Sequence, residues 1–200
     1  MLDERTRAVL RRLEEETARE EESGLSPLER SLQIAPSTGA LLFALCAGRP
    51  GCEVLEIGGS RGYSTIWLGA AVRLHGGHVT SLEADPAKLE ASARNIADAG
   101  LADSIDVIPG DAFESLEGLD GPFDLVFLDA WKEDYEPLFQ VARARLEAGA
   151  IVVADNVLSH QALRAYSSAR QADPTLVSVT VPLDSGLEVS SVLTGWLLSG

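Results

Sequence analysis

Strand-like and helix-like segments alternate along most of the chain. The run at 125–128 is wholly apolar and bounded by polar residues, which is typical of a strand buried on both faces of a parallel sheet. Further strands are predicted at 53–57, 78–82, 105–108 and 150–154, and helices between the strands at about 64–74, 85–100, 113–116 and 135–146. This alternation predicts a doubly wound α/β sheet.

The C-terminal part departs from this alternation. A helix is predicted at about 161–170, and strands at 176–181 and 187–193 are joined by Leu183-Asp-Ser-Gly186, a composition typical of a hairpin. We therefore expect a mainly parallel, seven-stranded sheet that ends in an antiparallel hairpin. Trp196 is interpreted as a terminal packing residue.

The first 30 residues are predicted to form a helical arm. Charges of both signs dominate from Leu2 to about Glu22 and leave one narrow apolar stripe, and Gly24, Ser26 and Pro27 interrupt the helix. Such a helix packs on a surface or on a partner, although a solvated arm fits the same pattern. Another helix is expected to end near Ala47. We interpret residues 1–200 as a single domain.

Composition restricts the partners. A formal net charge of −15 argues against nucleic acid, because its recognition normally relies on basic groups that neutralise phosphates. No apolar run approaches the roughly 20 residues that span a bilayer. The N-terminus lacks the hydrophobic core of a signal peptide, so we expect a cytoplasmic protein without a membrane partner. Cys46 and Cys52 have no metal-binding or redox spacing. A small-molecule acceptor is the favoured partner.

Two residues just beyond the apolar run at 125–128 are candidates for chemistry. Asp129 follows the strand directly, and Lys132 lies three residues later, in the region where open α/β sheets bind their ligands. The chain has 16 basic residues, of which only Lys88 and Lys132 are lysines. Because lysine, unlike arginine, can lose its proton in a protein, its use at this position favours a functional role.

Acidic residues lie at the ends of the first three predicted strands. Glu56 precedes a loop with Gly58, Gly59 and Gly62, whose spacing differs from the glycine pattern of dinucleotide sites. An acid at this position repels a diphosphate and attracts a cationic amino group. Glu83 is suited to ribose hydroxyls and Asp111 to an adenine amino group. These acids favour S-adenosylmethionine (SAM) over NAD.

A divalent cation site is predicted between the fourth and fifth strands. Asp129 ends one strand and Asp155-Asn156 ends the next, so we expect their side chains to converge. Two carboxylates and a carboxamide provide three oxygen ligands, which suits a hard cation such as Mg²⁺.

These motifs resemble those of the cation-dependent SAM O-methyltransferases, the group that includes catechol and caffeoyl-CoA O-methyltransferases. The matching segments lie at 54–65, 81–86, 110–112, 123–135 and 153–157. The resemblance implies a Rossmann-like methyltransferase fold in which Lys132 is the general base, while Asp129, Asp155 and Asn156 hold the cation.

The resemblance also implies the remaining contacts. Those to SAM would come from Glu56, Gly58, Ser64, Glu83, Asp111, Ala112, Asp129 and Trp131. A homodimer is implied as well, which gives the N-terminal helix a possible role at the interface. Ala130 departs from the catechol-type pattern, where a larger residue stands, so the width of the acceptor pocket stays open.

The predicted reaction is methyl transfer from SAM to a hydroxyl of a small vicinal-diol acceptor of the catechol type. Two other readings of the sequence remain open at this stage. One is a nucleotide-dependent oxidoreductase-like domain, and the other is a SAM-binding module without catalytic activity.

Overall fold

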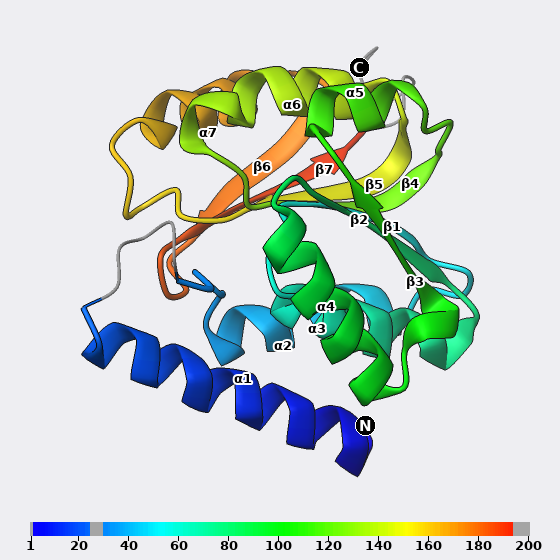
Figure 1. The fold of residues 1–200 in the computed structure, drawn as a ribbon. Coiled ribbons are helices and arrows are strands. Elements are labelled where there is room, and N and C mark those ends of the chain that lie inside the picture. The colour runs from blue at the N-terminus through cyan, green and yellow to red at the C-terminus, as the bar shows by residue number, and fades with distance from the viewer. Residues whose placement is uncertain (1, 25–29, 194–200) are drawn as a thin grey trace.

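Helices cover both faces of one central sheet. The computed structural model describes residues 2–24 and 30–193. Figure 1 shows α2, α3 and α4 on one face of the sheet, with α1 outside them, and α5, α6 and α7 on the other face. The helices span α1 (Glu4–Glu22), α2 (Pro36–Ala47), α3 (Tyr63–Val72), α4 (Pro86–Ala99), α5 (Ala112–Glu117), α6 (Tyr135–Arg143) and α7 (Leu163–Ala172). Short 3₁₀ turns lie at Arg73–His75, Ala102–Ser104 and Lys132–Asp134.

The sheet confirms the predicted fold class. Its strands are β1 (Glu53–Ile57), β2 (His78–Glu83), β3 (Ile105–Pro109), β4 (Phe123–Leu128), β5 (Leu146–Ala154), β6 (Leu176–Val181) and β7 (Leu187–Val192). Their spatial order is β3-β2-β1-β4-β5-β7-β6. The first five strands pair in parallel, and β7 pairs antiparallel with both β5 and β6.

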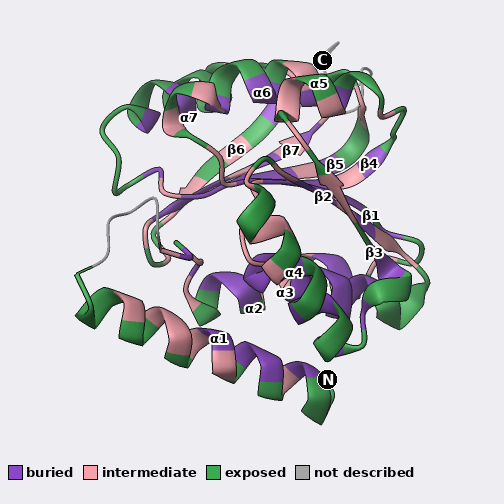
Figure 2. Ribbon diagram, viewed as in Figure 1, coloured by how far each residue is buried: buried purple, intermediate pink, exposed green. Residues whose placement is uncertain are grey.

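Successive residues of the central strands contribute to two hydrophobic cores. Val54, Phe127 and Val153 pack towards α2 and α3, whereas side chains such as Leu55 and Val126 pack towards α6. This division follows from the alternation of side chains along a strand. In Figure 2 the central strands β1 and β4 are largely buried and the outer face of α1 is exposed.

Helix ends in the first half follow the capping signals of the sequence. The Asp85 carboxylate accepts a hydrogen bond from Ala87 N at 2.9 Å, Pro86 is the first residue of α4, and Gly100 ends the helix with a φ of 72°. The apolar stripe of α1 is buried against α3 and α4. The N-terminal helix is therefore packed on the domain.

One predicted boundary is wrong. The helix expected at 135–146 ends at Arg143, and β5 begins at Leu146 because Leu146 pairs with Phe123 before the register shifts. Gly149 has a φ of 88°, a conformation that glycine adopts readily, and lies in this irregular part of the strand. The prediction for Trp196 lies outside the described residues. Within the described ranges, the helices are too short or too polar to cross a bilayer.

The register of the parallel strands brings their carboxyl ends to one edge. Ile57 pairs with Leu82 on one side and with Leu128 on the other, and Leu128 pairs with Ala154. The backbone pairing continues past the strands, since Asp129 N donates to Ile57 O at 3.0 Å and Asp155 N donates to Leu128 O at 3.1 Å. The loops after β1, β2, β4 and β5 therefore start side by side.

The hydrophobic core extends to this edge of the sheet. Phe127 is fully buried, two residues before Asp129. We expect Phe127→Ala to lower the free energy of unfolding by about 3–5 kcal/mol, because the change leaves a cavity under the site. Urea denaturation measures this change. The control is Val177→Ala on the edge strand, where 61% exposure predicts an effect below about 0.5 kcal/mol.

Candidate active site at the carboxyl ends of the strands

Asp129 is the centre of a polar cluster at the end of β4. Its Oδ1 accepts hydrogen bonds from Lys132 Nζ at 3.1 Å and from Asn156 Nδ2 at 2.9 Å. Lys132 Nζ also donates to Ala130 O and to Tyr135 Oη, both at 3.1 Å. The three donors of an ammonium group are thus all engaged.

The loop after β5 supplies the other half of the cluster. Asp155 Oδ1 accepts from the backbone N–H of Asn156 at 2.7 Å. Asn156 has a φ of 66°, in the left-handed region that asparagine tolerates better than most residues. This conformation accompanies the turn in which its side chain reaches back to Asp129. The structure therefore brings Asp129, Lys132, Asp155 and Asn156 together, as the sequence predicted.

The cluster carries two carboxylates close together. Burial raises the pKa of Asp155 to about 7, and the charge of Asp129 adds to this rise, while the N–H of Asn156 and the Lys132 ammonium oppose it. Burial and the same two carboxylates also raise the pKa of Tyr135, which remains protonated. Because one lysine does not compensate both carboxylates, the site favours additional positive charge.

The donor set fits a hard divalent cation. Carboxylate and carboxamide oxygens are the ligands that Mg²⁺ takes in proteins, usually with several waters retained. Nowhere in residues 2–24 and 30–193 do three or more His, Cys, Asp or Glu residues gather in a way that could hold a metal ion. The cluster at Asp129 offers two carboxylates, and the carboxamide of Asn156 adds a third side chain with an oxygen donor.

The loop after β1 lies directly against this cluster. A Cβ atom at Gly58 would lie 2.2 Å from the carbonyl oxygen of Asp129, and Gly58 has a φ of 98°. A Cβ atom at Gly59 would lie 2.2 Å from Ser81 Oγ. Only glycine permits these close approaches. A narrow pocket at this point is lined by Gly58, Ser64, Asp129 and parts of 31–34 and 59–63.

Glu56 lies beneath the loop and is fully buried. Its Oε2 accepts from Ser81 Oγ at 2.6 Å and from Thr65 Oγ1 at 2.5 Å. Burial raises the pKa of Glu56, and the hydroxyl groups of Ser64, Ser81 and Thr65 work against the rise. None of the ion pairs in the described part of the chain involves this carboxylate. A ligand ammonium group at the loop would favour the charged form of this carboxyl group.

The other predicted cofactor residues differ in how closely they join the site. Glu83 is tied to the glycine loop, since its Oε2 accepts from Ser60 N at 2.7 Å. Asp111 is exposed and caps α5, with Oδ1 accepting from Phe113 N at 2.8 Å, and Ala112 begins that helix. Trp131 is 60% exposed beside the cluster. Asp111 therefore lies apart from the Asp129 cluster, at the end of β3.

Tyr135 was not predicted as a site residue. It begins α6 three residues after Lys132, and its hydroxyl group lies 3.1 Å from Lys132 Nζ and 3.5 Å from Asp129 Oδ1. Its spacing from Lys132 was the available signal, because residues three apart face each other on a helical turn. Ser60 was also missed, and its φ of 47° is visible only in the structure.

Comparisons with known proteins agree with this geometry. A family model described as a methyltransferase domain matches residues 55–157. Catechol O-methyltransferase from Mycobacterium tuberculosis is 34% identical over 173 residues, which cover 82% of this chain and 77% of that protein. A catechol O-methyltransferase from Niastella koreensis is 36% identical over 64% of this chain and 59% of its own length.

Solved structures show the same similarity. An O-methyltransferase from Bacillus cereus in complex with SAH has a TM-score of 0.77 and 26% identity, over 92% of this chain and 90% of that one. An O-methyltransferase of tomaymycin synthesis from Streptomyces achromogenes, in complex with SAM, has a TM-score of 0.77 and 27% identity, over 91% of this chain and 89% of that one. Fold, relatives and solved neighbours agree, and the chain belongs to the methyltransferase domain family as a SAM-dependent O-methyltransferase.

Proposed function

We propose that the protein transfers the methyl group of SAM to one hydroxyl of a small vicinal diol of the catechol type, in a reaction that needs a divalent cation. The observation that carries this proposal is the convergence of Asp129, Asp155 and Asn156 with Lys132 beside the glycine loop. The names of the two catechol O-methyltransferases support the same acceptor class.

The oxygen atoms of Asp129, Asp155 and Asn156 are the protein ligands that we assign to the cation, with Mg²⁺ as the expected metal. The cation would supply Lewis-acid chemistry, which makes a hydroxyl of the acceptor easier to deprotonate and fixes its position. A vicinal diol suits this role because its two neighbouring oxygens can bind together. The protein's contribution is a fixed geometry, provided by the paired ends of β4 and β5.

Lys132 is assigned as the general base. A neutral amine at this position can accept the proton of the acceptor hydroxyl at Nζ, and the resulting ammonium group has three acceptors ready. Asp129 provides one of these acceptors and the Tyr135 hydroxyl another. Tyr135 is fully buried, so it also holds the lysine side chain in place.

Residues of the first three loops are assigned to SAM, which supplies an electrophilic methyl group on a sulfonium. Gly58 and the buried Glu56 would face its amino-acid part, with Ser64 on the adjacent turn. Glu83 would bind the ribose hydroxyls, and Asp111 with Ala112 would lie at the adenine. Trp131 and Asp129 would border the reacting methyl group.

The acceptor would enter between the loops after β4 and β5. Ala130 is small, and the exposed apolar side chains of Trp131 and Leu158 stand on these two loops, 60% and 57% exposed respectively. Such a rim fits a flat aromatic acceptor. The homodimer implied by the family resemblance, and the lack of nucleic-acid and membrane partners, stay predictions.

Removal of divalent cations tests the cation requirement. We expect a chelator to reduce methylation of a catechol about 100-fold or more, because the acceptor loses both its activation and its positioning. Binding of S-adenosylhomocysteine, measured by calorimetry, should change less than about threefold. The control is chelator saturated with Mg²⁺ beforehand. Methylation that continues undiminished in the chelator would remove the cation from the proposal.

Replacement of the base tests the role of Lys132. We expect Lys132→Ala to reduce turnover at neutral pH about 10²- to 10⁴-fold, as is typical when a general base is lost. The affinity for S-adenosylhomocysteine should stay within about threefold. The matched control is Lys88→Ala, which removes the chain's other lysine. Equal losses of affinity and turnover would assign Lys132 a structural role.

The pH dependence of cation binding tests Asp155. Because its pKa is raised to about 7, a proton must leave Asp155 before a cation binds at lower pH. Affinity for Mg²⁺ should therefore be about tenfold weaker at pH 6 than at pH 8 and should level off above about pH 8. Isothermal titration calorimetry of the protein saturated with S-adenosylhomocysteine measures this profile. Asp155→Asn should bind weakly, without this pH dependence; a flat wild-type profile would contradict the assignment.

A further inference from the structure

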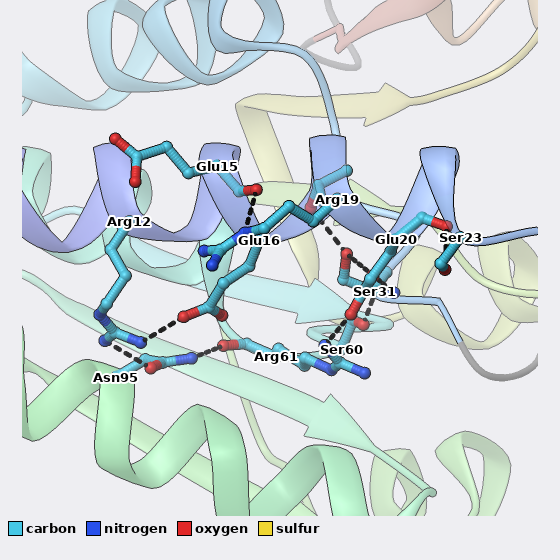
Figure 3. Close-up of polar contacts among 11 residues, drawn as sticks. Arg12, Glu15, Glu16, Arg19, Glu20, Ser23, Ser31, Ser60, Arg61 and Asn95 are labelled. Atoms are coloured by element: carbon cyan, nitrogen blue, oxygen red, sulfur yellow. Dashed lines mark hydrogen bonds and ion pairs between the residues drawn. The ribbon is translucent and has the colours of Figure 1, made fainter. Parts of the chain in front are cut away.

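The C-terminal end of α1 is attached to the glycine loop through one carboxylate. Glu20 forms an ion pair with Arg61, which belongs to that loop, and its side chain is only 13% exposed. Its Oε2 accepts from Ser31 N at 2.8 Å and from Ser31 Oγ at 2.9 Å. Burial acts to raise the pKa of Glu20, but the donors of Ser31 and Arg61 outweigh it and lower the pKa overall. The carboxylate is therefore charged. Figure 3 shows Glu20 between Ser31 and Arg61.

The contact continues from Ser31 to the cofactor side of the loop. Ser31 O accepts from Ser60 Oγ at 2.6 Å, and Ser60 N donates to Glu83 Oε2 at 2.7 Å. Ser60 has a φ of 47°, which is disfavoured for a residue with a Cβ atom. The hydrogen bonds that Ser60 donates to Ser31 and Glu83 hold it in this backbone conformation. A chain of hydrogen bonds therefore links Glu20 to the carboxylate assigned to the ribose.

Other contacts attach α1 to the same region. Arg12 Nη2 donates to Asn95 Oδ1 at 2.9 Å, and Asn95 Nδ2 donates to Arg61 O at 2.8 Å. Tyr63 Oη donates to Glu14 at 2.6 Å. Figure 3 shows how the first of these contacts runs from α1 through Asn95 to the loop. These contacts fix the loop at Arg61 and Tyr63, whereas Glu20 is linked to Ser60 through Ser31.

We propose that Glu20 is a positioning residue for the cofactor, which acts through Ser31 and Ser60 to hold Glu83 in the orientation that receives the nucleoside. This proposal rests on the assignment of Glu83 to the ribose. We assign Glu20 no direct contact with the cofactor, since its contacts are with Ser31 and Arg61. Its effect comes from preorganisation, because a loop that is already ordered loses less conformational freedom when the ligand binds. The N-terminal helix is thus a functional part of the cofactor site.

The test is Glu20→Gln, which keeps the shape of the side chain and removes its charge and one acceptor. We expect the dissociation constant for S-adenosylhomocysteine to rise about tenfold, as for the loss of a hydrogen bond to a charged group. The KM for SAM should rise similarly, while kcat at saturating SAM stays within about twofold. In the ligand-free protein, the amide hydrogen of Ser60 should exchange faster.

The matched control is Glu4→Gln. Glu4 lies on the same helix and pairs with Arg11 at 2.9 Å, but its contacts stay within the helix. We expect the control to bind S-adenosylhomocysteine like the wild type. Binding of S-adenosylhomocysteine to the wild type is measured without acceptor or cation, which separates this test from the proposed methyl transfer. A wild type that does not bind S-adenosylhomocysteine would contradict the assignment of the cofactor site as a whole.

A second variant tests the route through Ser60. Ser60→Ala removes the hydrogen bond to Ser31 O and should weaken binding of S-adenosylhomocysteine. If Glu20 acts through Ser60, the variant that carries both Glu20→Gln and Ser60→Ala should lose less binding free energy than the sum of the losses in the two single variants. Additive effects would overturn the route. Wild-type affinity of Glu20→Gln, or a lowered melting temperature with unchanged affinity and exchange at Ser60, would overturn the positioning role.

Discussion

The constraint on which the site depends is the register of the parallel strands. Ile57, Leu128 and Ala154 pair across β1, β4 and β5, and the hydrogen bonding continues into the loops through Asp129 N and Asp155 N. The loops that carry the proposed active site therefore leave the sheet at the same level. Buried strands resist displacement, because a shift of one residue would turn every core side chain to the opposite face. The hydrophobic core thereby fixes the separation of the polar groups.

Asp129 illustrates how this rigidity is used. One carboxylate oxygen accepts hydrogen bonds from Lys132 and Asn156. The backbone carbonyl of Asp129 lies so close to Gly58 that only glycine fits at that position. The proposed base, the proposed cation site and the cofactor loop therefore meet at a single residue. The nearby Asp155 keeps a raised pKa because burial and Asp129 both disfavour its charge. A site with excess buried negative charge is suited to a cationic ligand.

The polar network of α1 extends the same principle to the cofactor. Ser60 is held in a left-handed conformation between Ser31 and Glu83, and Glu20 holds Ser31. Helix α1 lies outside the layer formed by α3 and α4 (Figure 1). Residues from separate segments, Glu20, Ser31 and Glu83, are thereby joined at the loop. The helix that looked like a charged arm in the sequence is connected to the centre of the proposed cofactor site.

The sequence by itself determined the strand–helix alternation and the residues at the strand ends, because both are local patterns. Buried strands are apolar, and Asp129, Lys132, Asp155 and Asn156 lie within four residues of a strand end. It misplaced the start of β5, where pairing with Phe123 extends the strand through a polar stretch. Only the tertiary structure decided the roles available to Ser60 and Glu20. Their contacts depend on how helices and loops pack. The backbone angle of Ser60 depends on its hydrogen-bond partners, which come from two other segments. Local residue patterns carry no record of such long-range contacts.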